Sequence, residues 1–161
     1  MIILLMGVSG AGKTTVGKSL AAALHCEFAD ADDYHSPANI EKMRNRIPLT
    51  DADREPWLET LRALIANWIA SRKTAVLACS ALKQTYRDQL RVSPEVRFIY
   101  LRVSPALLHE RLRHRTGHFM TEAMLASQLA TLEEPRDAIV VNGDSSPEEV
   151  TAEILRQIPA Y

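Results

Sequence analysis

The sequence predicts an α/β fold, a doubly wound parallel sheet with helices on both faces. Short apolar segments alternate with helical patterns along the chain, and several of these segments are apolar throughout, as is typical of strands covered on both sides. The 161 residues fit a single domain, and the contents of 47% hydrophobic and 24% charged residues are ordinary for a globular protein. No internal repeat or Gly/Ser-rich linker divides the chain.

Five short segments are expected to form the strands, because runs of this length suit buried strands. They are Ile2–Met6, Glu27–Asp30, Thr74–Cys79, Val96–Leu101 and Ala138–Val141. In a doubly wound sheet, ligands bind beyond the carboxyl ends of the strands. We therefore expect the functional residues directly after these segments.

Helices are expected between the strands. Val16, Leu20 and Leu24 mark one face of the first helix, and apolar residues from Trp57 to Trp68 mark a long amphipathic one. A further helix is expected to begin at Ser80, just past the third strand. Two more begin at serine N-caps followed by proline, and the second of these has a capping box: they are Ser104-Pro105 and Ser146-Pro147-Glu148-Glu149.

Charge and cysteine usage exclude several classes of protein. The 19 basic and 20 acidic residues give a formal net charge of −1, which gives no overall electrostatic case for binding nucleic acid. The apolar run at residues 1–6 is too short to span a membrane and lacks the layout of a signal peptide. Cys26 and Cys79 are too few for a disulfide scaffold, which indicates a reducing compartment. We expect a cytoplasmic protein with neither nucleic acid nor membrane as partner.

Residues 7–14, GVSGAGKT, match the phosphate-loop pattern G-x-x-x-x-G-K-[ST]. Glycines let such a loop turn its N–H groups toward phosphate oxygens, and the following helix N-terminus adds further donors. Lys13 is expected to reach the β- and γ-phosphates, and the Thr14 hydroxyl to hold Mg²⁺. The alternative is an ordinary glycine-rich turn, but an apolar strand precedes this motif and a helix follows it. The expected nucleotide contacts are Gly7, Val8, Ser9, Gly10, Ala11, Gly12, Lys13, Thr14 and Thr15.

Two carboxylates stand at the end of the second strand. Period-2 geometry places Asp30 and Asp32 on the same side of the chain. Next to a triphosphate, such a pair can hold water on Mg²⁺ and accept a proton from an attacking hydroxyl. The alternative is a solvated strand end. The third strand ends in Ser80 rather than the aspartate of many switch and motor ATPases, which favours small kinases with the acid on the second strand.

Several basic residues are candidates for anion binding. Lys83 and Arg87 are four residues apart on the expected helix after Ser80, and Arg111 and Arg115 repeat that spacing beside an apolar stripe. The first pair is expected to meet an anionic substrate and the second to clamp the transferring phosphoryl group. For each pair the alternative is a solvated basic face. Arg54 stands near the start of the long helix, where the helix dipole offers a cation nothing, so a ligand is the more natural partner.

Together these motifs resemble the gluconate kinases, small phosphate-loop kinases related to shikimate and adenylate kinases. The matching residues run in family order over much of the chain. They are residues 6–13; His35 with residues 39–43; Pro48-Leu49, Asp51, Asp53-Arg54 and residues 56–58; residues 79–83 with 86–88; residues 117–119; and Gln128, Leu132, Glu134 and Pro135.

The resemblance implies ATP-dependent phosphorylation of D-gluconate at its 6-hydroxyl, giving 6-phosphogluconate and ADP. It implies a three-layer α/β/α fold with a helical acceptor region near residues 35–71, a lid near residues 111–122, and a possible homodimer. Asp32 would contact the acceptor hydroxyl, and Asp30 would hold Mg²⁺ through water. The candidate acceptor contacts are Asp32, His35, Lys42, Arg54, Lys83, Arg87 and His118. The alternatives are a kinase for another sugar acid or polyol acid and a nucleotide-binding regulator without turnover.

Overall fold

The structure is a computed structural model that describes residues 1–114 and 121–159. Helices connect each strand to the next, as the sequence predicts. In chain order the elements are β1 (Ile2–Met6), α1 (Lys13–Ala23), β2 (Glu27–Asp30), the 3₁₀ helix η1 (Ala31–Tyr34), α2 (Pro37–Arg44), α3 (Asp51–Ala70), β3 (Ala75–Ala78), α4 (Gln84–Leu90), β4 (Val96–Arg102), α5 (Pro105–Arg113), α6 (Glu122–Thr131), β5 (Ile139–Asn142) and α7 (Pro147–Gln157).

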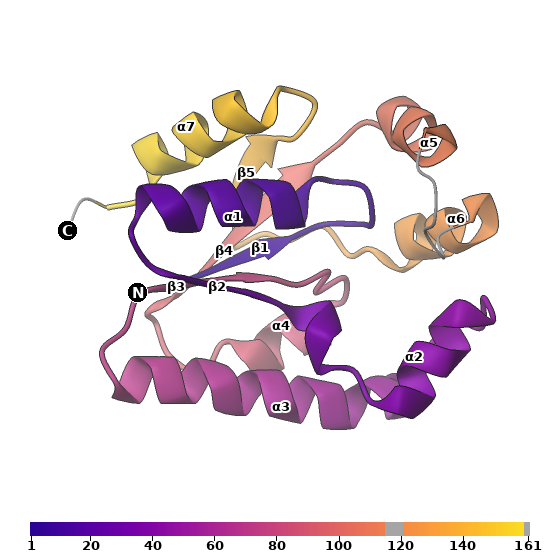
Figure 1. The fold of residues 1–161 in the computed structure, drawn as a ribbon, viewed down its shortest axis with the longest axis horizontal. Helices are drawn as coiled ribbons and strands as arrows, with labels where there is room; N and C mark the ends of the chain where they lie inside the picture. The colour runs from indigo at the N-terminus through magenta and orange to yellow at the C-terminus, as the bar shows by residue number, and fades with distance from the viewer. Residues whose placement is uncertain (115–120, 160–161) are drawn as a thin grey trace.

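The strands form one parallel sheet in the order β2-β3-β1-β4-β5. Side chains of the central strand β1 alternate between two cores, with Leu4 on the α3 side of the sheet and Leu5 on the α1 and α7 side. Figure 1 shows the resulting three layers, with α1 and α7 on one face and α3 and α4 on the other. The predicted three-layer α/β/α fold is confirmed, and each expected strand ends within one residue of the observed one.

The long helix α3 begins earlier than the apolar pattern alone suggests. Thr50 caps it, and Asp53 completes a capping box three residues later. Arg54 therefore lies in the first turns of α3, and Pro56 lies inside the helix. Asp53 also accepts both hydrogen bonds of Lys42 at 2.9 and 2.8 Å, which ties α2 to α3.

The sequence predicts a helix that begins at Ser80, and the structure corrects this start. Ala81 has a φ of 45°, in the left-handed region that helical residues do not adopt, and α4 begins only at Gln84. Lys83 is the N-cap residue, with extended backbone. Its side chain and that of Arg87 consequently meet different partners and do not form the shared basic face that their spacing predicts.

The two helices of the expected acceptor region, α2 and α3, pack differently. Of residues 35–71, α3 lies along the sheet and contributes to its core, whereas α2 extends past the end of the sheet where α5 and α6 also lie (Figure 1). The expected lid, 111–122, falls partly on residues outside the described ranges.

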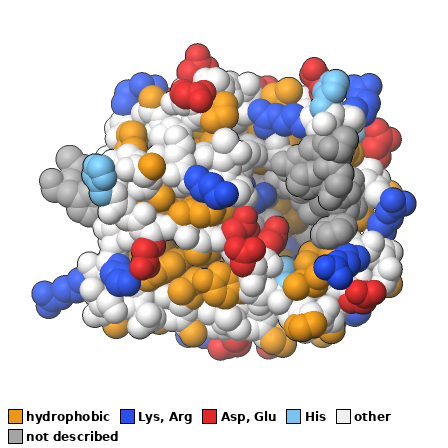
Figure 2. All heavy atoms as spheres, in the orientation of Figure 1, with side chains coloured by type: hydrophobic (Ala, Val, Ile, Leu, Met, Phe, Trp, Pro, Cys, Tyr) orange, Lys and Arg blue, Asp and Glu red, His pale blue; other side chains and the backbone are white. Residues whose placement is uncertain are grey.

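On the face shown in Figure 2, basic and acidic side chains are interspersed. Within the described residues, no helix is long and apolar enough to span a bilayer.

Candidate active site

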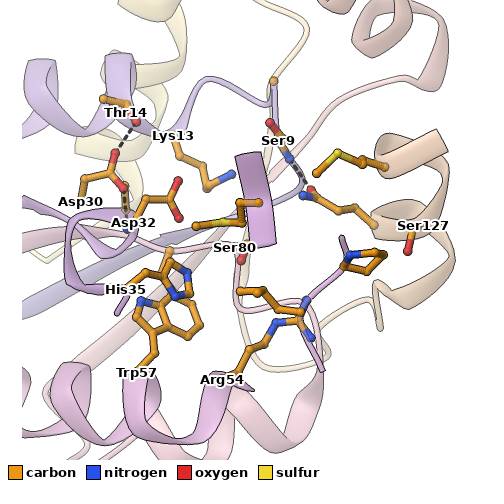
Figure 3. Close-up of a pocket in the computed structure, with 18 of the residues that line it drawn as sticks. Ser9, Lys13, Thr14, Asp30, Asp32, His35, Arg54, Trp57, Ser80 and Ser127 are labelled. Carbon is orange, nitrogen blue, oxygen red and sulfur yellow. Dashed lines mark hydrogen bonds between the residues drawn. The ribbon is translucent and has the colours of Figure 1, made fainter. Parts of the chain in front are cut away.

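A cavity of about 420 Å³ lies at the carboxyl ends of β1, β2 and β3. The loop after β1, the start of α1, η1, α3 and α6 all contribute to its wall, so the cavity brings together residues far apart in sequence. Figure 3 shows the side chains that point into it, with Lys13, Asp30 and Asp32 on one side and Arg54 on another. Open α/β sheets bind ligands at this position.

The phosphate loop forms one wall of this cavity. A side chain at Gly7 would place its Cβ 3.0 Å from the Leu101 carbonyl oxygen, and Gly12 caps α1 with a φ of 94°. Lys13 Nζ donates to the carbonyl oxygens of Gly7 and Val8, each at 2.9 Å, which folds the cation over the loop. Val8 and Ala11 are buried beneath it. The loop residues that line the cavity are Ser9, Gly10, Gly12, Lys13, Thr14 and Thr15.

Thr14 and Asp30 form a polar pair beside the loop. Thr14 Oγ1 donates to Asp30 Oδ2 at 2.7 Å, and Asp30 Oδ1 accepts from the backbone N–H of Asp32 at 3.0 Å (Figure 3). The second bond caps η1 and fixes the direction of the Asp30 carboxylate. A hydroxyl and a carboxylate next to a phosphate loop are hard oxygen ligands of the kind that Mg²⁺ prefers. The residues present therefore fit the metal predicted from the sequence.

Asp32 lies beside Lys13 and Asp30, with its carboxylate in the cavity (Figure 3). Desolvation by the surrounding protein raises the pKa of Asp32, the neighbouring Asp30 carboxylate raises it further, and Lys13 opposes both effects. A carboxylate with a raised pKa is a stronger base than an ordinary aspartate. Asp32 can therefore accept a proton from a hydroxyl held next to the phosphate loop.

His35 is held in the cavity as a neutral imidazole. Its ring stacks on Trp57 with centroids 4.4 Å apart and an interplanar angle of 12°. Burial, with Arg54 nearby, lowers the pKa of His35 to about 4. Asn39 Nδ2 contacts His35 Nδ1 at 3.3 Å and donates to the Asp53 carbonyl at 2.8 Å. Because an amide nitrogen only donates, Nδ1 accepts, and Nε2–H remains the donor of the ring.

Arg54 enters the cavity from α3 and is anchored outside it. Its Nη1 donates to the Tyr86 hydroxyl at 3.2 Å, and that hydroxyl donates a short hydrogen bond to Asp51. Lys83 Nζ donates to the same Asp51 carboxylate at 3.0 and 3.2 Å. This network uses one guanidinium nitrogen and orients the rest of Arg54 toward a ligand. Lys83 supports Arg54 through Asp51 and does not itself line the cavity.

Two other expected acceptor contacts lie outside the cavity. Arg87 is 1% exposed, and its guanidinium donates to the carbonyl oxygens of Ala81, Leu82 and Glu133 at 2.8, 3.1 and 2.8 Å. It ties α4 to the segment after α6. Lys42 is paired with Asp53, and this pairing lowers the pKa of Asp53 to about 2. Both cations have structural partners where the sequence predicts substrate contacts.

Arg111 reaches the phosphate loop from α5. Its Nη1 donates to the Gly10 carbonyl oxygen at 2.7 Å, and its Nη2 donates to that of Gly143 at 3.2 Å. Arg111 thus ties α5 to the phosphate loop but does not line the cavity, so its expected role in clamping the transferring phosphoryl group stays a prediction. Arg115 and His118 lie outside the described residues, so their expected roles stay predictions.

The sequence alone assigns no role to several residues that shape this cavity. Ser80, Ser127, Met124 and Gln128 line it, and the Ser9 backbone N–H donates to Gln128 Oε1 at 2.7 Å. Trp57, which the sequence places on the apolar face of the long helix, also supports His35. Gln128 is among the residues that carry the family resemblance, and that resemblance is the one feature of the sequence that points to it.

The phosphate loop, the parallel sheet and the carboxylates after β2 define a phosphate-loop small-molecule kinase. The family model described as shikimate kinase matches residues 9–159. Gluconokinase of Gluconobacter oxydans (strain 621H) is 45% identical over 98% of this chain and 91% of its own. Thermoresistant gluconokinase of Escherichia coli (strain K12) is 42% identical over 98% of this chain and 93% of its own. The chain belongs to the gluconokinase family.

Solved structures agree with this assignment. A gluconokinase from Sinorhizobium meliloti 1021 superposes with a TM-score of 0.84 at 45% identity, covering 96% of this chain and 89% of that one. An unliganded sugar kinase from Janibacter sp. HTCC2649 gives a TM-score of 0.89 at 43% identity, covering 96% and 92%. Shikimate kinase from Aquifex aeolicus, at 20% identity and a TM-score of 0.61 over 97% and 94% of the two chains, shows the same fold.

Proposed function

We propose that the protein phosphorylates D-gluconate at its 6-hydroxyl with ATP, giving 6-phosphogluconate and ADP. One observation carries this proposal: a single cavity joins the phosphate loop and Asp32 to a cationic side chain, Arg54, and a neutral donor, His35. A sugar acid needs these partners, because it carries a carboxylate, a chain of hydroxyls and a terminal hydroxyl to be phosphorylated. The names of the related gluconokinases support the same substrate.

The phosphate loop and its neighbours would bind the triphosphate. Loop N–H groups and the start of α1 face the phosphates, and Lys13 neutralises charge that spreads over the transferring group. Thr14 and, through water, Asp30 would hold Mg²⁺, which offsets phosphate charge when bound. Arg111 holds the Gly10 carbonyl and so stabilises the shape of the loop.

Asp32 would orient the 6-hydroxyl and accept its proton. Lys13 beside it keeps the ionised form accessible, while the cavity and Asp30 make that carboxylate more basic. Arg54 would bind the carboxylate of gluconate, since a guanidinium offers several donors to an anion. His35 Nε2–H would donate to a hydroxyl oxygen of the acceptor. Positioning both reactants in one cavity supplies much of the rate enhancement.

ADP release tests the proposal. The protein is assayed with ATP and Mg²⁺ against D-gluconate, other sugar acids, shikimate and no acceptor, and again without added divalent cation. We expect turnover with gluconate well above every other arm and loss of turnover without the metal. Turnover with a different acceptor would transfer the mechanism to that acid. Nucleotide binding without turnover on any acceptor would favour a regulator. Cytoplasmic location and a homodimer stay predictions from the sequence.

A further inference from the structure

Gln128 connects α6 to the phosphate loop through a single side-chain hydrogen bond. Its Oε1 accepts from the backbone N–H of Ser9 at 2.7 Å, across 119 positions of sequence (Figure 3). A carboxamide has one accepting end and one donating end. A backbone N–H can donate but not accept, so its partner must be the amide oxygen of Gln128. The bond therefore fixes which end of the Gln128 side chain faces the loop. The amide nitrogen Nε2 is left as the other end.

The donating end of Gln128 has no protein partner within residues 1–114 and 121–159: no group there accepts a hydrogen bond from Nε2. Gln128 lines the same cavity as Asp32, His35 and Arg54. It reaches that cavity from α6, whereas His35 and Arg54 belong to the segment from η1 to α3. The N–H donors of Nε2 are therefore left for a ligand of this cavity, on a different wall from His35 and Arg54.

We infer that Gln128 contacts the acceptor, donating from Nε2 to one of its hydroxyl oxygens. This inference rests on the proposed function, which supplies a polyol acid as the ligand of the cavity. Arg54 suits the carboxylate, Asp32 the terminal hydroxyl, and Gln128 a hydroxyl of the chain between them. Because Ser9 of the phosphate loop holds the Gln128 amide oxygen, a contact from Nε2 would position the acceptor relative to that loop. Gln128 thereby favours acceptors that carry a hydroxyl at the matching carbon.

The first test is Gln128→Met, which keeps the length of the side chain but removes both hydrogen-bonding ends. We expect the KM for gluconate to rise roughly 10-fold or more, since a site built for a hydroxyl loses its donor. Binding of a non-hydrolysable ATP analogue and the melting temperature are expected to stay near wild-type values. Gln157→Met, on the remote helix α7, is the matched control and should change none of these quantities.

The second test separates a direct contact from a structural role. Wild type and Gln128→Met are compared on gluconates lacking one hydroxyl at C2, C3, C4 or C5. With wild type, we expect one of these analogues to have a kcat/KM roughly 10-fold below that of gluconate. With the variant, the kcat/KM values of that analogue and of gluconate should be equal. Equal penalties in both proteins at every carbon, or loss of nucleotide binding in the variant, would overturn the inference. Wild-type turnover on gluconate is measured first, so a failure of the proposed function shows there and not in the comparison.

Discussion

The Tyr86 hydroxyl accepts a hydrogen bond from Arg54 Nη1 at 3.2 Å and donates one to Asp51. Tyr86 is buried on α4 and lies outside the cavity, so it acts on a ligand only through Arg54. The relationship makes the acceptor site depend on a helix that does not line it. Lys83, bound to the same Asp51 carboxylate, completes the support.

Tyr86→Phe removes this anchor and keeps the ring. We expect the KM for gluconate to rise about 3- to 10-fold, because one hydrogen bond of about 1 kcal/mol no longer holds Arg54 in place. The KM for ATP should stay within about twofold, since Arg54 is not part of the phosphate loop. Tyr100→Phe, on β4, removes a hydroxyl that contacts Glu134 in the segment after α6, and serves as the control. An unchanged gluconate KM would remove Tyr86 from the positioning of Arg54.

Asp32→Asn tests the proposed base. We expect kcat to fall about 10²- to 10⁴-fold, the usual contribution of general base catalysis, with nucleotide affinity nearly unchanged. In wild type, turnover should fall as the pH drops through the raised pKa of Asp32, because protonation removes the base. This acidic limb should be absent in the variant. Asp88→Asn, at an exposed position on α4, is the control. Turnover within about twofold of wild type in Asp32→Asn would assign the proton to another group.

Arg87→Met tests whether this arginine is structural. The variant leaves three carbonyl oxygens without their donor, so we expect the free energy of unfolding to fall by about 3 kcal/mol. The melting temperature should fall by roughly 10 °C. Measured well below that temperature, the KM for gluconate should match wild type. Arg62→Met, at an exposed ion pair, is the control for stability. A raised gluconate KM with unchanged stability would restore the substrate contact predicted from the sequence.

His35 makes the stability depend on pH in acid. Its pKa is about 4 in the folded protein and 6.5 ordinarily, so between these values the unfolded chain binds a proton that the native protein does not. The free energy of unfolding therefore falls as the pH drops through this window. Urea midpoints at pH 7.5, 5.5 and 4.5 should decrease more steeply for wild type than for His35→Gln. His109→Gln, with an exposed side chain, should keep the wild-type slope.

The parallel sheet and the phosphate loop were predictable because local patterns determine them. Apolar runs of strand length and serine-proline caps depend on neighbouring residues alone, and both lead to the observed elements. The helix after β3 was placed too early because a left-handed alanine leaves no mark in the sequence. Nothing in the residues near Ala81 indicates that this position departs from helical backbone.

The roles of individual cations were not predictable from spacing. Arg54 and Arg87 each stand on a helix, yet one lines the cavity and the other is enclosed by backbone carbonyls. The difference comes from tertiary contacts with Tyr86 and with the segment after α6. The role of Gln128 was not predictable for the same reason, because its partner Ser9 lies 119 positions away in the sequence.

The proposed reaction transfers a phosphoryl group from ATP to the terminal hydroxyl of gluconate. The most direct test is to incubate the protein with ATP, Mg²⁺ and an equimolar mixture of gluconate, other sugar acids and shikimate, and to identify the products by ³¹P and ¹³C NMR. We expect one phosphorylated product, with phosphate on C6 of gluconate. Phosphate on another acid or another carbon, or ADP formed without any phosphorylated acid, would contradict it.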